Sequence, residues 1–371
     1  MLQPLNNQWD ALDNNSLMPT VSHTRLWLAP MFEHFSKKNT CLVSAQTTQE
    51  NNGSLQAITA LKKITLPGGL ALPVAQTWDN GFLFSGTPLI SRNSPQAAMT
   101  ALLSSARHEL GAKAVLFKKV QRCDQFDQLL GHLSAKAIAG HQLFNIHQRA
   151  ALFCSGDFDQ WFNENFSRKR RKEYRRLRNR LSEIDVLQSQ TWQKGEPVEQ
   201  WVEEFIQLEA AGWKGRNGTA VACSIEQTAH LRHALSQMAK NGSLLFWKIT
   251  LGDKPIACLF GFQQHNQVWL GKIAYDETLS QFSPGVLAIL NATKDLFARK
   301  DVTMVDSSAD PDHPMINNIW RDRITVADYL VATPGTGKAT FKALIALEKN
   351  RMKLRNLAKT AYYKLRKGSK Q

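Results

Sequence analysis

The chain of 371 residues has no run of about 18 uncharged apolar residues, which is the length that a membrane-spanning helix needs. Its first residues also lack the order of a secretory signal peptide, in which a basic segment precedes an apolar one. We therefore expect a cytoplasmic protein. At this length, the usual size of a domain predicts two domains.

Cysteine is scarce and scattered. The five cysteines are Cys41, Cys123, Cys154, Cys223 and Cys258. They are odd in number and form no Cys-x-x-Cys pair, a pattern that favours reduced thiols over disulfides or a zinc site. His230 and His233 lie three residues apart in a predicted helix, but no further ligand is near them in the sequence, so no metal site is expected.

Two familiar catalytic motifs are also missing. The segment 334–338, Pro-Gly-Thr-Gly-Lys, does not complete a phosphate loop, because Ala332 and Ala339 stand where that pattern needs Gly and Ser or Thr. No Gly-x-Ser-x-Gly elbow is present to support a Ser-His-Asp hydrolase.

Acidic residues are outnumbered, and the net charge is +15. The excess is concentrated in two segments. Residues 167–181 carry nine Lys or Arg against Glu173, and residues 335–371 carry eleven against Glu348. Such segments attract partners that bear phosphate, namely nucleic acid, anionic lipid head groups or a phosphorylated cofactor.

The most informative part of the sequence is 244–306. Three predicted strands, separated by turn pairs at hairpin spacing, lie at 244–251, 255–263 and 268–274. Ser283-Pro284-Gly285 then begins a predicted helix, and 302–305 forms another strand. Because the first N–H groups of a helix lack intrahelical partners, this order predicts an anion site whose natural ligand is phosphate.

This arrangement resembles the cofactor half of a GNAT-superfamily acyltransferase. The resemblance extends upstream to 208–220 and to 167–181, and downstream to Asp306 and Trp320. These features are similar to the CelD-type cellulose and polysaccharide biosynthesis proteins, a branch related to the FemAB aminoacyltransferases. The resemblance implies that strand 268–274 pairs with the pantetheine arm of an acyl-CoA and that the next helix holds the pyrophosphate.

The resemblance also implies an α/β (α+β) fold of tandem GNAT-like domains, with mixed, largely antiparallel sheets flanked by helices. We predict a degenerate N-terminal domain over 20–140, an acyltransferase domain over 141–333 and a basic amphipathic tail over 334–371. In the N-terminal domain the pattern favours strands at 42–45, 69–74, 82–84 and 114–117, and helices at 55–62 and 95–110.

The predicted cofactor site consists of Ser283, the N–H groups of Gly285, Val286 and Leu287, and Ala274 on the preceding strand. A side chain at Gly285 is expected to fill the approach to the helix and abolish binding without disturbing the fold. The alternative interpretation of this segment is an ordinary capped helix start.

Glu209 is the first candidate for catalysis. Its spacing from Val202 and Phe205 places it on the apolar face of a predicted helix, where burial would raise its pKa and suit it to act as a general base. The alternative is a buried ion pair with Lys214 or Arg216.

Lys272 and Asp276 are the other catalytic candidates. Strand alternation places both on the same side as Ala274, so they are expected to form a polar pair beside the reacting thioester. Solvated surface positions are the alternative.

Four residues are candidates for the acceptor pocket. Asp306 ends the next strand, and Trp213, Lys214 and Trp320 are expected to line the pocket with it. The alternatives are that Asp306 caps its neighbours near Ser307 and that the tryptophans belong to the core.

We therefore predict an N- or O-acyltransferase that uses acyl-CoA or an acyl carrier protein as donor. The acyl group would go to an amine or hydroxyl of a small molecule, glycan or lipid, in an envelope- or polysaccharide-related pathway. Acyl-CoA would be a co-substrate, with no permanently bound cofactor. One alternative is a FemAB-like transferase that uses aminoacyl-tRNA, held by 168–180. The other is a nonenzymatic module that binds nucleic acid or membrane.

A long helix is predicted over 340–367. Its apolar stripe includes Leu347, Leu354 and Leu365, and its other side is rich in lysine. We expect this helix to hold the protein peripherally at the anionic surface of the inner membrane. The alternative is that its leucines pack on the core of the protein.

Overall fold

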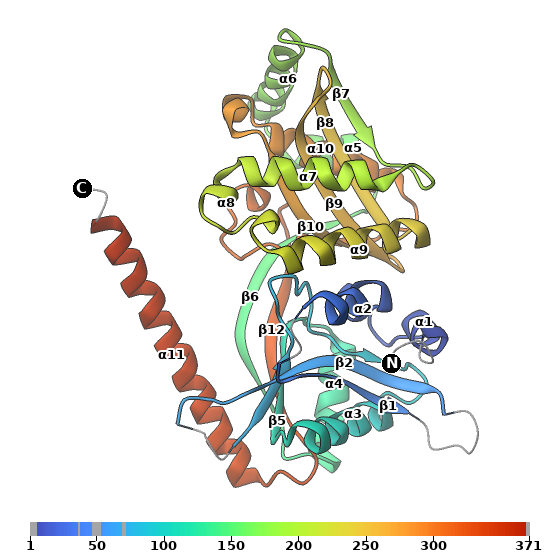
Figure 1. The fold of residues 1–371 in the computed structure, drawn as a ribbon, viewed down its shortest axis with the longest axis vertical. Coiled ribbons are helices and arrows are strands. Elements are labelled where there is room, and N and C mark those ends of the chain that lie inside the picture. Colours follow the sequence, from blue (N-terminus) through green and yellow to red (C-terminus); the bar gives the residue numbers. More distant parts are fainter. Residues whose placement is uncertain (1–5, 36–37, 47–52, 69–71, 369–371) are drawn as a thin grey trace. The chain divides into compact units, whose positions relative to one another are not determined.

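The computed structural model describes residues 6–35, 38–46, 53–68 and 72–368, with side chains as far as residue 360 (Figure 1). The chain forms two compact units. Unit 1 consists of Met1–His23, Lys37–Ile146 and Val326–Gln371, and unit 2 of Thr24–Ser36 and His147–Thr325. These units interleave along the chain, unlike the three consecutive segments that were predicted.

Unit 1 contains a mixed sheet in the strand order β1 (Thr40–Gln46), β2 (Leu55–Ile64), β3 (Val74–Thr77), β5 (Ala114–Gln121) and β12 (Asp322–Ala332). The pairs are antiparallel except β3 with β5, which are parallel. The short β4 (Leu89–Ile90) pairs with β2. The helices are α1 (Asn6–Asn14), α3 (Pro95–Leu110) and α4 (Asp124–Lys136), with a short 3-10 turn at Val21–His23.

The helix predicted at 55–62 is wrong, because these residues belong to β2. This strand is paired on both sides, and most of its residues are buried. The strand predicted at 82–84 is not formed, and part of the one predicted at 69–74 lies outside the described residues. The helix at 95–110 is confirmed with its predicted bounds.

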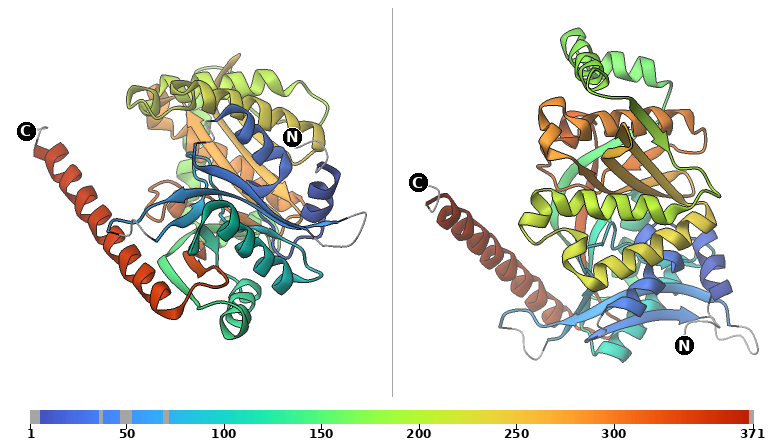
Figure 2. Two further views of the ribbon diagram at one scale, coloured as in Figure 1. Left: turned by 60° about the horizontal axis from the view of Figure 1, so that its bottom comes forward. Right: turned by 45° about the horizontal axis from the view of Figure 1, so that its top comes forward.

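The C-terminal helix α11 (Lys338–Gly368) is one uninterrupted helix (Figures 1 and 2). Its first half belongs to unit 1, because Phe341 and Leu344 are buried in the core of that unit and Leu347 packs against it. From Lys353 to Thr360 every side chain is exposed, including Leu354. The predicted tail is therefore part of the fold over its first half. The side chain of Leu365 lies outside the described residues.

Unit 2 contains the predicted meander. Its strand order is β6 (His141–Phe153), β11 (Met304–Asp306), β10 (Gln267–Tyr275), β9 (Lys254–Gln264), β8 (Leu244–Leu251) and β7 (Leu187–Thr191). Only β10 with β11 is parallel among these pairs. The three strands predicted over 244–274 are thereby confirmed.

Helices cover both faces of the unit 2 sheet (Figure 1). On one face, Phe205 of α7 (Val198–Ala211) packs on the rings of Phe246 and Phe260. The alternate residues of the same strands, Trp247 and Leu259, pack on the other face with α10 (Pro284–Ala298). This is the period-two alternation of a sheet that is buried on both faces.

The remaining helices of unit 2 are α2 (Arg25–His34), α5 (Phe158–Asn165), α6 (Arg168–Ser182), α8 (Trp213–Arg216) and α9 (Ile225–Asn241), with 3-10 turns at Val221–Cys223, Glu277–Phe282 and Ile316–Asn318. Mixed sheets flanked by helices confirm the predicted fold class. Over the residues that the structure describes, no helix has the length and apolar character needed to cross a membrane.

Candidate active site

A bulge in β10 is the first feature of the site. The pairing of β10 with β9 shifts register between Leu270 and Ile273, so Gly271 and Lys272 are accommodated as an irregularity. A Cβ atom on Gly271 would lie 2.1 Å from the ring of Phe260, on the α7 face of the sheet. The side chain of Lys272 also reaches α7. Two consecutive residues therefore point to the same face, which is the effect of a β-bulge.

Beyond this bulge, one edge of β10 has no strand beside it. The pairing with β11 covers Gln267–Trp269 and ends at Asp306, whereas β10 continues to Tyr275. The Asp276 N–H donates to the carbonyl of Ile256 in β9. In an antiparallel pair the direction of the backbone groups alternates, so those of Ile273 and Tyr275 face away from β9. Among the described residues, no strand covers this edge.

A carboxylate with two lysines lies next to that edge. Glu209 of α7 is buried, and its Oε1 accepts from Lys214 Nζ at 2.9 Å and from Lys272 Nζ at 3.3 Å. Its Oε2 accepts from the Val221 N–H at 2.8 Å. Lys214 also donates to the carbonyl of Ile273 at 3.2 Å, which connects the group to the open edge of β10. We call Glu209, Lys214 and Lys272 the lysine–glutamate cluster.

The charges of this cluster decide its protonation. Burial by itself would raise the pKa of Glu209, but Lys214, Lys272 and the Val221 N–H outweigh it and hold the pKa below its ordinary value. The expected rise of this pKa is therefore wrong. The ion pair with Lys214, the alternative interpretation, is present, whereas Arg216 pairs with Glu277.

Burial acts on Lys272 in the opposite direction to its effect on Glu209. Burial lowers the pKa of its ammonium group, Glu209 opposes this shift, and the charge of Lys214 adds to it. Two ammonium groups share one carboxylate, so the three groups together have a net charge of +1 when all are ionised. The side chains of Lys214 and Lys272 are 25% and 22% exposed, so a bound molecule can reach them.

Asp276 does not pair with Lys272. It is the N-cap of the turn Glu277–Phe282, where its Oδ1 accepts from the Thr278 N–H, and its Oδ2 accepts from Lys254 at 2.7 Å. Burial would raise the pKa of Asp276, but these partners lower it overall. The expected polar pair of Lys272 and Asp276 is wrong, because each residue pairs with another partner.

The helix start at Pro284 lies where it was predicted, but its first turn differs from the expected cradle. Ser283 has a left-handed backbone, φ 51°, and its hydroxyl does not cap the helix. The N–H groups of Val286 and Leu287 donate to the Ser283 carbonyl. The N–H groups of Val286 and Leu287 are therefore both already engaged as donors. Within the described residues, the Gly285 N–H has no acceptor.

The space beside Gly285 is filled by the protein itself. A Cβ atom on this residue would lie 2.9 Å from the ring of Tyr275 and 3.3 Å from Met315 Sδ. The expectation that a side chain here would leave the fold undisturbed is wrong, because it would first displace Tyr275. Ala274, also predicted to contact the cofactor, is buried in β10 opposite Cys258.

Two predicted acceptor residues belong to the interior. Asp306 is fully buried, pairs with the guanidinium of Arg149 and accepts from the Ser308 N–H at 2.8 Å. Burial raises its pKa although both partners oppose this. Trp320 is fully buried and its Nε1 donates to Thr293 Oγ1 at 3.0 Å. The expectation that they line a pocket is wrong.

Trp213 is placed differently. Its side chain is 49% exposed at the start of α8, immediately before Lys214 of the lysine–glutamate cluster. Its N–H donates to Glu277 Oε1 at 2.6 Å. The position is compatible with contact to a bound molecule, and the role of Trp213 in binding stays a prediction.

Sequence reasoning missed His313, which lies in the loop after β11. Its Nδ1 accepts from the N–H groups of Met315 and Ile316 at 3.3 and 3.4 Å. Burial lowers its pKa, Asp310 opposes the shift, and the positive charge of Lys214 adds to it. With Nδ1 as the acceptor, the neutral ring carries its proton on Nε2 and is a donor there. No local pattern in the sequence distinguishes this histidine.

The basic helix α6 adjoins the start of α10. Tyr174, Leu177 and Leu181 are buried, whereas all of its cationic residues except the half-buried Arg171 are exposed. The guanidinium of Arg180 lies over the ring of Phe282 at 5.1 Å from its centroid, and Phe282 immediately precedes the turn into α10. The cationic surface and the helix N-terminus are thus neighbours within unit 2.

The sequence of this region has a recognisable family signature. Residues 168–313 match the model of the family described as acetyltransferase (GNAT) domain. The match begins at α6 and ends at His313, so it includes the bulge, the cluster and the α10 N-terminus. The similarity to a GNAT-type acetyltransferase domain thus lies within unit 2. No curated protein sequence matches the chain.

Solved structures resemble the chain over nearly its whole length. A conserved protein of unknown function from Bacteroides thetaiotaomicron is 12% identical with a TM-score of 0.58, covering 90% of this chain and 98% of that one. FemX is 10% identical with a TM-score of 0.56, covering 92% and 98%. The C-terminal domain of a candidate lysylphosphatidylglycerol synthetase from Agrobacterium fabrum is 10% identical with a TM-score of 0.51, covering 93% and 96%. At these identities the likeness concerns the fold.

Proposed function

We propose that the protein is an acyltransferase whose donor lies along the open edge of β10. The observation that carries this proposal is the open edge of β10 after Trp269, where its pairing with β11 ends. An extended donor arm there can hydrogen-bond to the backbone of Ile273 and Tyr275 as a further strand would. The match of 168–313 to the acetyltransferase family supports the same reaction class.

In the proposed reaction an acceptor amine or hydroxyl attacks the carbonyl carbon of the donor acyl group. The bond from that carbon to the donor's leaving atom breaks, and the acceptor loses a proton. The net positive charge of the ionised lysine–glutamate cluster would stabilise the oxyanion that develops during attack. We assign the proton transfer to Lys272, whose pKa is lowered, rather than to Glu209 or Asp276, which are held as carboxylates by their partners. The ammonium group of Lys272 would be charged while the oxyanion forms, would then protonate the leaving atom, and as an amine would take up the proton that the acceptor loses.

Glu209 then acts by positioning. It fixes both ammonium groups near the carbonyl of Ile273, where the donor would lie. We propose that the Nε2–H of the neutral His313 ring is a further hydrogen-bond donor to the substrate. A reaction that relies on positioned cations and N–H groups requires the acceptor to be held in line with the donor. Trp213 is proposed to contact the acceptor, because it is exposed beside Lys214.

Two donors fit this site. One is acyl-CoA or an acyl carrier protein, with phosphate near the Gly285 N–H and Arg180. The other is aminoacyl-tRNA, and the observation that favours it is the exposed charge of α6, which exceeds what the few phosphates of a CoA require. The FemAB resemblance and the fold shared with FemX support this alternative equally well. If the protein were a nonenzymatic binding module, α6 would bind the anionic partner and the lysine–glutamate cluster would have no catalytic role.

Thermal melting separates these donors. Only a ligand that binds the folded protein raises the melting temperature, and a ligand at 100 times its Kd stabilises by about 2.7 kcal/mol. The protein would be melted with CoA, acetyl-CoA, longer acyl-CoAs and aminoacyl-tRNA. If none of them raises the melting temperature, the donor site on β10 is refuted. Transfer assays with amine and hydroxyl acceptors would then identify the product.

A charge variant of α6 identifies the donor more sharply. Arg168→Gln, Lys172→Gln and Arg175→Gln together remove three exposed charges from one face of the helix. For an RNA donor, three lost phosphate contacts should reduce the slope of log K against log salt by about 2. Binding of acyl-CoA at the start of α10 should change little. A matched control removes three exposed charges from α11, by glutamine at Lys342, Lys349 and Lys353.

The pathway and the membrane contact are further parts of the proposal. The CelD-type resemblance suggests an acceptor in envelope or polysaccharide synthesis, either a glycan or a lipid. The exposed second half of α11 would hold the protein at an anionic bilayer, where each Lys or Arg contributes about 1 kcal/mol. Binding to vesicles with anionic lipid, and its loss at high salt, would test this contact.

A further inference from the structure

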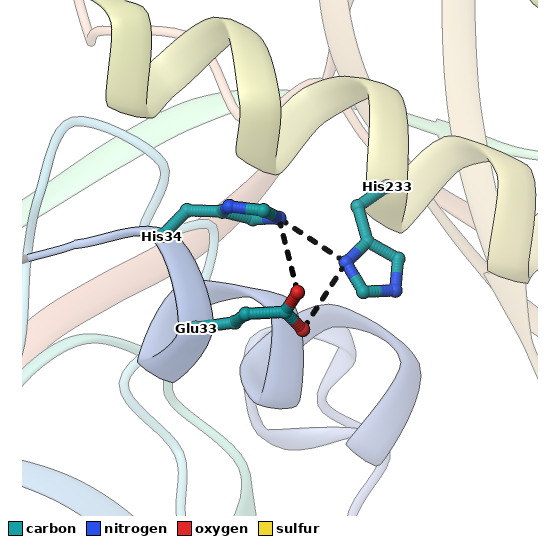
Figure 3. A group of neighbouring side chains, drawn as sticks. All are labelled: Glu33, His34 and His233. Carbon is teal, nitrogen blue, oxygen red and sulfur yellow. Dashed lines mark hydrogen bonds and ion pairs between the residues drawn. The ribbon is translucent and has the colours of Figure 1, made fainter.

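Three side chains outside the candidate active site converge where α2 meets α9. Glu33 and His34 end α2, and His233 lies on α9 (Figure 3). These two helices pack along each other within unit 2. His233 is 199 residues away from His34 in the sequence, so their meeting is a property of the tertiary structure.

The ligand atoms of this group lie close to the spacing that a tetrahedral metal site requires. His34 Nε2 lies 3.2 Å from His233 Nδ1, Glu33 Oε2 lies 3.5 Å from His233 Nδ1, and Glu33 Oε1 lies 4.0 Å from His34 Nε2. Zinc binds nitrogen and carboxylate oxygen at about 2.0–2.2 Å, which separates neighbouring ligands of a tetrahedron by roughly 3.3–3.6 Å. Small side-chain rotations would bring all three atoms to that spacing.

The composition of the group also suits zinc. Two imidazoles and one carboxylate are a ligand set that this ion accepts, with a fourth position left for water. The side chains of His34 and His233 are 23% and 32% exposed, and that of Glu33 is 61% exposed, so an ion can enter from solvent. The other ring nitrogen of His233, Nε2, lies 3.5 Å from Gln237 Nε2. A flip of this amide would place its oxygen there, where it can accept from the Nε2–H of a metal-bound histidine.

His230 is not part of this group, although it lies only three residues before His233 in the sequence. Its Nε2 lies 3.1 Å from the carbonyl of Trp27, and its ring packs edge-on against the Trp27 ring. Burial lowers the pKa of His230 to about 4, although the bond to Trp27 opposes this. The sequence-based argument against a metal site considered His230 and His233 alone, and the structure supplies the other ligands from α2.

We propose that Glu33, His34 and His233 bind one Zn²⁺ ion, which joins α2 to α9. Segment 24–36 is separated in the sequence from the remainder of unit 2. A metal bond between these helices closes a long loop of chain, so it restricts the unfolded state and stabilises the docked position of α2. The ion would be structural, because the site does not include the residues of the lysine–glutamate cluster.

Zinc titration tests this proposal. The full-length protein is stripped with EDTA, exchanged into metal-free buffer and titrated with ZnCl2 in a calorimeter, with CoCl2 as a spectroscopic substitute. We expect one saturable site and a rise in melting temperature on addition of zinc. His233→Ala and Glu33→Gln should each weaken zinc binding by at least the roughly 10–100-fold that loss of a second-shell partner costs. Both should abolish the thermal shift.

The controls keep the result interpretable. His108→Ala removes an exposed histidine from α3 of unit 1 and should bind zinc as the unmodified protein does. Glu33 is exposed, so Glu33→Gln should melt in EDTA like the unmodified protein, even if His233→Ala is less stable. Equal zinc affinity in Glu33→Gln, His233→Ala and the unmodified protein would overturn the proposal. The absence of any saturable site would overturn it as well.

Discussion

Replacing Glu209 with glutamine tests the account of the lysine–glutamate cluster. The amide keeps the shape of the side chain and can still accept from the Val221 N–H, but it leaves Lys214 and Lys272 without their shared carboxylate. Breaking a fully buried ion pair costs about 3–5 kcal/mol. Since both lysines are about a quarter exposed, water can compensate in part, and we expect a loss of about 2–3 kcal/mol.

The pH dependence of the same variant gives an independent check. The pKa of Glu209 is lower in the folded protein than its ordinary value of 4.5. A carboxyl of this kind stabilises the fold above the unfolded pKa, and the contribution is lost as the pH falls through the folded pKa. The difference in unfolding free energy between the two proteins should thus be complete above about pH 5.5 and shrink below pH 4.5.

Urea unfolding at several pH values measures both effects. Glu203→Gln is the matched control, because it removes an exposed carboxylate that pairs with Arg232. An exposed pair contributes about 0–1 kcal/mol, so this control should change little. The double variant Glu209→Gln with Lys272→Met should recover part of the loss, because it removes one of the two like charges that the carboxylate had held together. A loss below about 0.5 kcal/mol for Glu209→Gln, within the range of ordinary surface substitutions, would refute the reasoning.

Two further changes test the fold around the site and the C-terminal helix. Gly271→Ala should destabilise the protein by about 1–3 kcal/mol, because its Cβ would overlap the Phe260 ring. Gly131→Ala is the control: its Cβ meets open space on a helix, and it should stabilise the protein by about 0.5–1 kcal/mol in the same melts. Removal of 334–371 should lower the melting temperature strongly or make the protein insoluble, whereas removal of 353–371 should leave melting nearly unchanged and abolish only vesicle binding. Equal melting of the two truncated proteins would contradict the division of α11.

Several features follow from the sequence alone, because they depend on neighbours in the chain. The strands over 244–274 alternate apolar and polar residues or run as buried segments between turn pairs, and they form as predicted. The helix at Pro284 begins where proline ends the preceding turn. The charge of 168–180 stays exposed, because so many cations on one helix cannot all be buried.

The failures have a common cause, which is that the deciding partner is far away in the sequence. Residues 55–62 carry a pattern compatible with a helix, but pairing with β1 and β3 makes them a strand. The pKa of Glu209 is lowered first by Lys214, five residues later, and then by Lys272, 63 positions later, which only the fold brings to it. Periodicity predicts which side chains are buried. It does not predict which charged residue lies next to a buried side chain.

The sequence by itself therefore determined the three strands over 244–274, the start of the helix at Pro284 and the segments where positive charge gathers. The tertiary structure decided which polar atoms meet. It placed Tyr275 against Gly285, buried Asp306 with Arg149, and brought Glu33 and His34 to His233. Local periodicity sets the face on which a side chain lies, but a hydrogen bond or metal site needs atoms within a few ångströms. That proximity is set only when sheets and helices pack together.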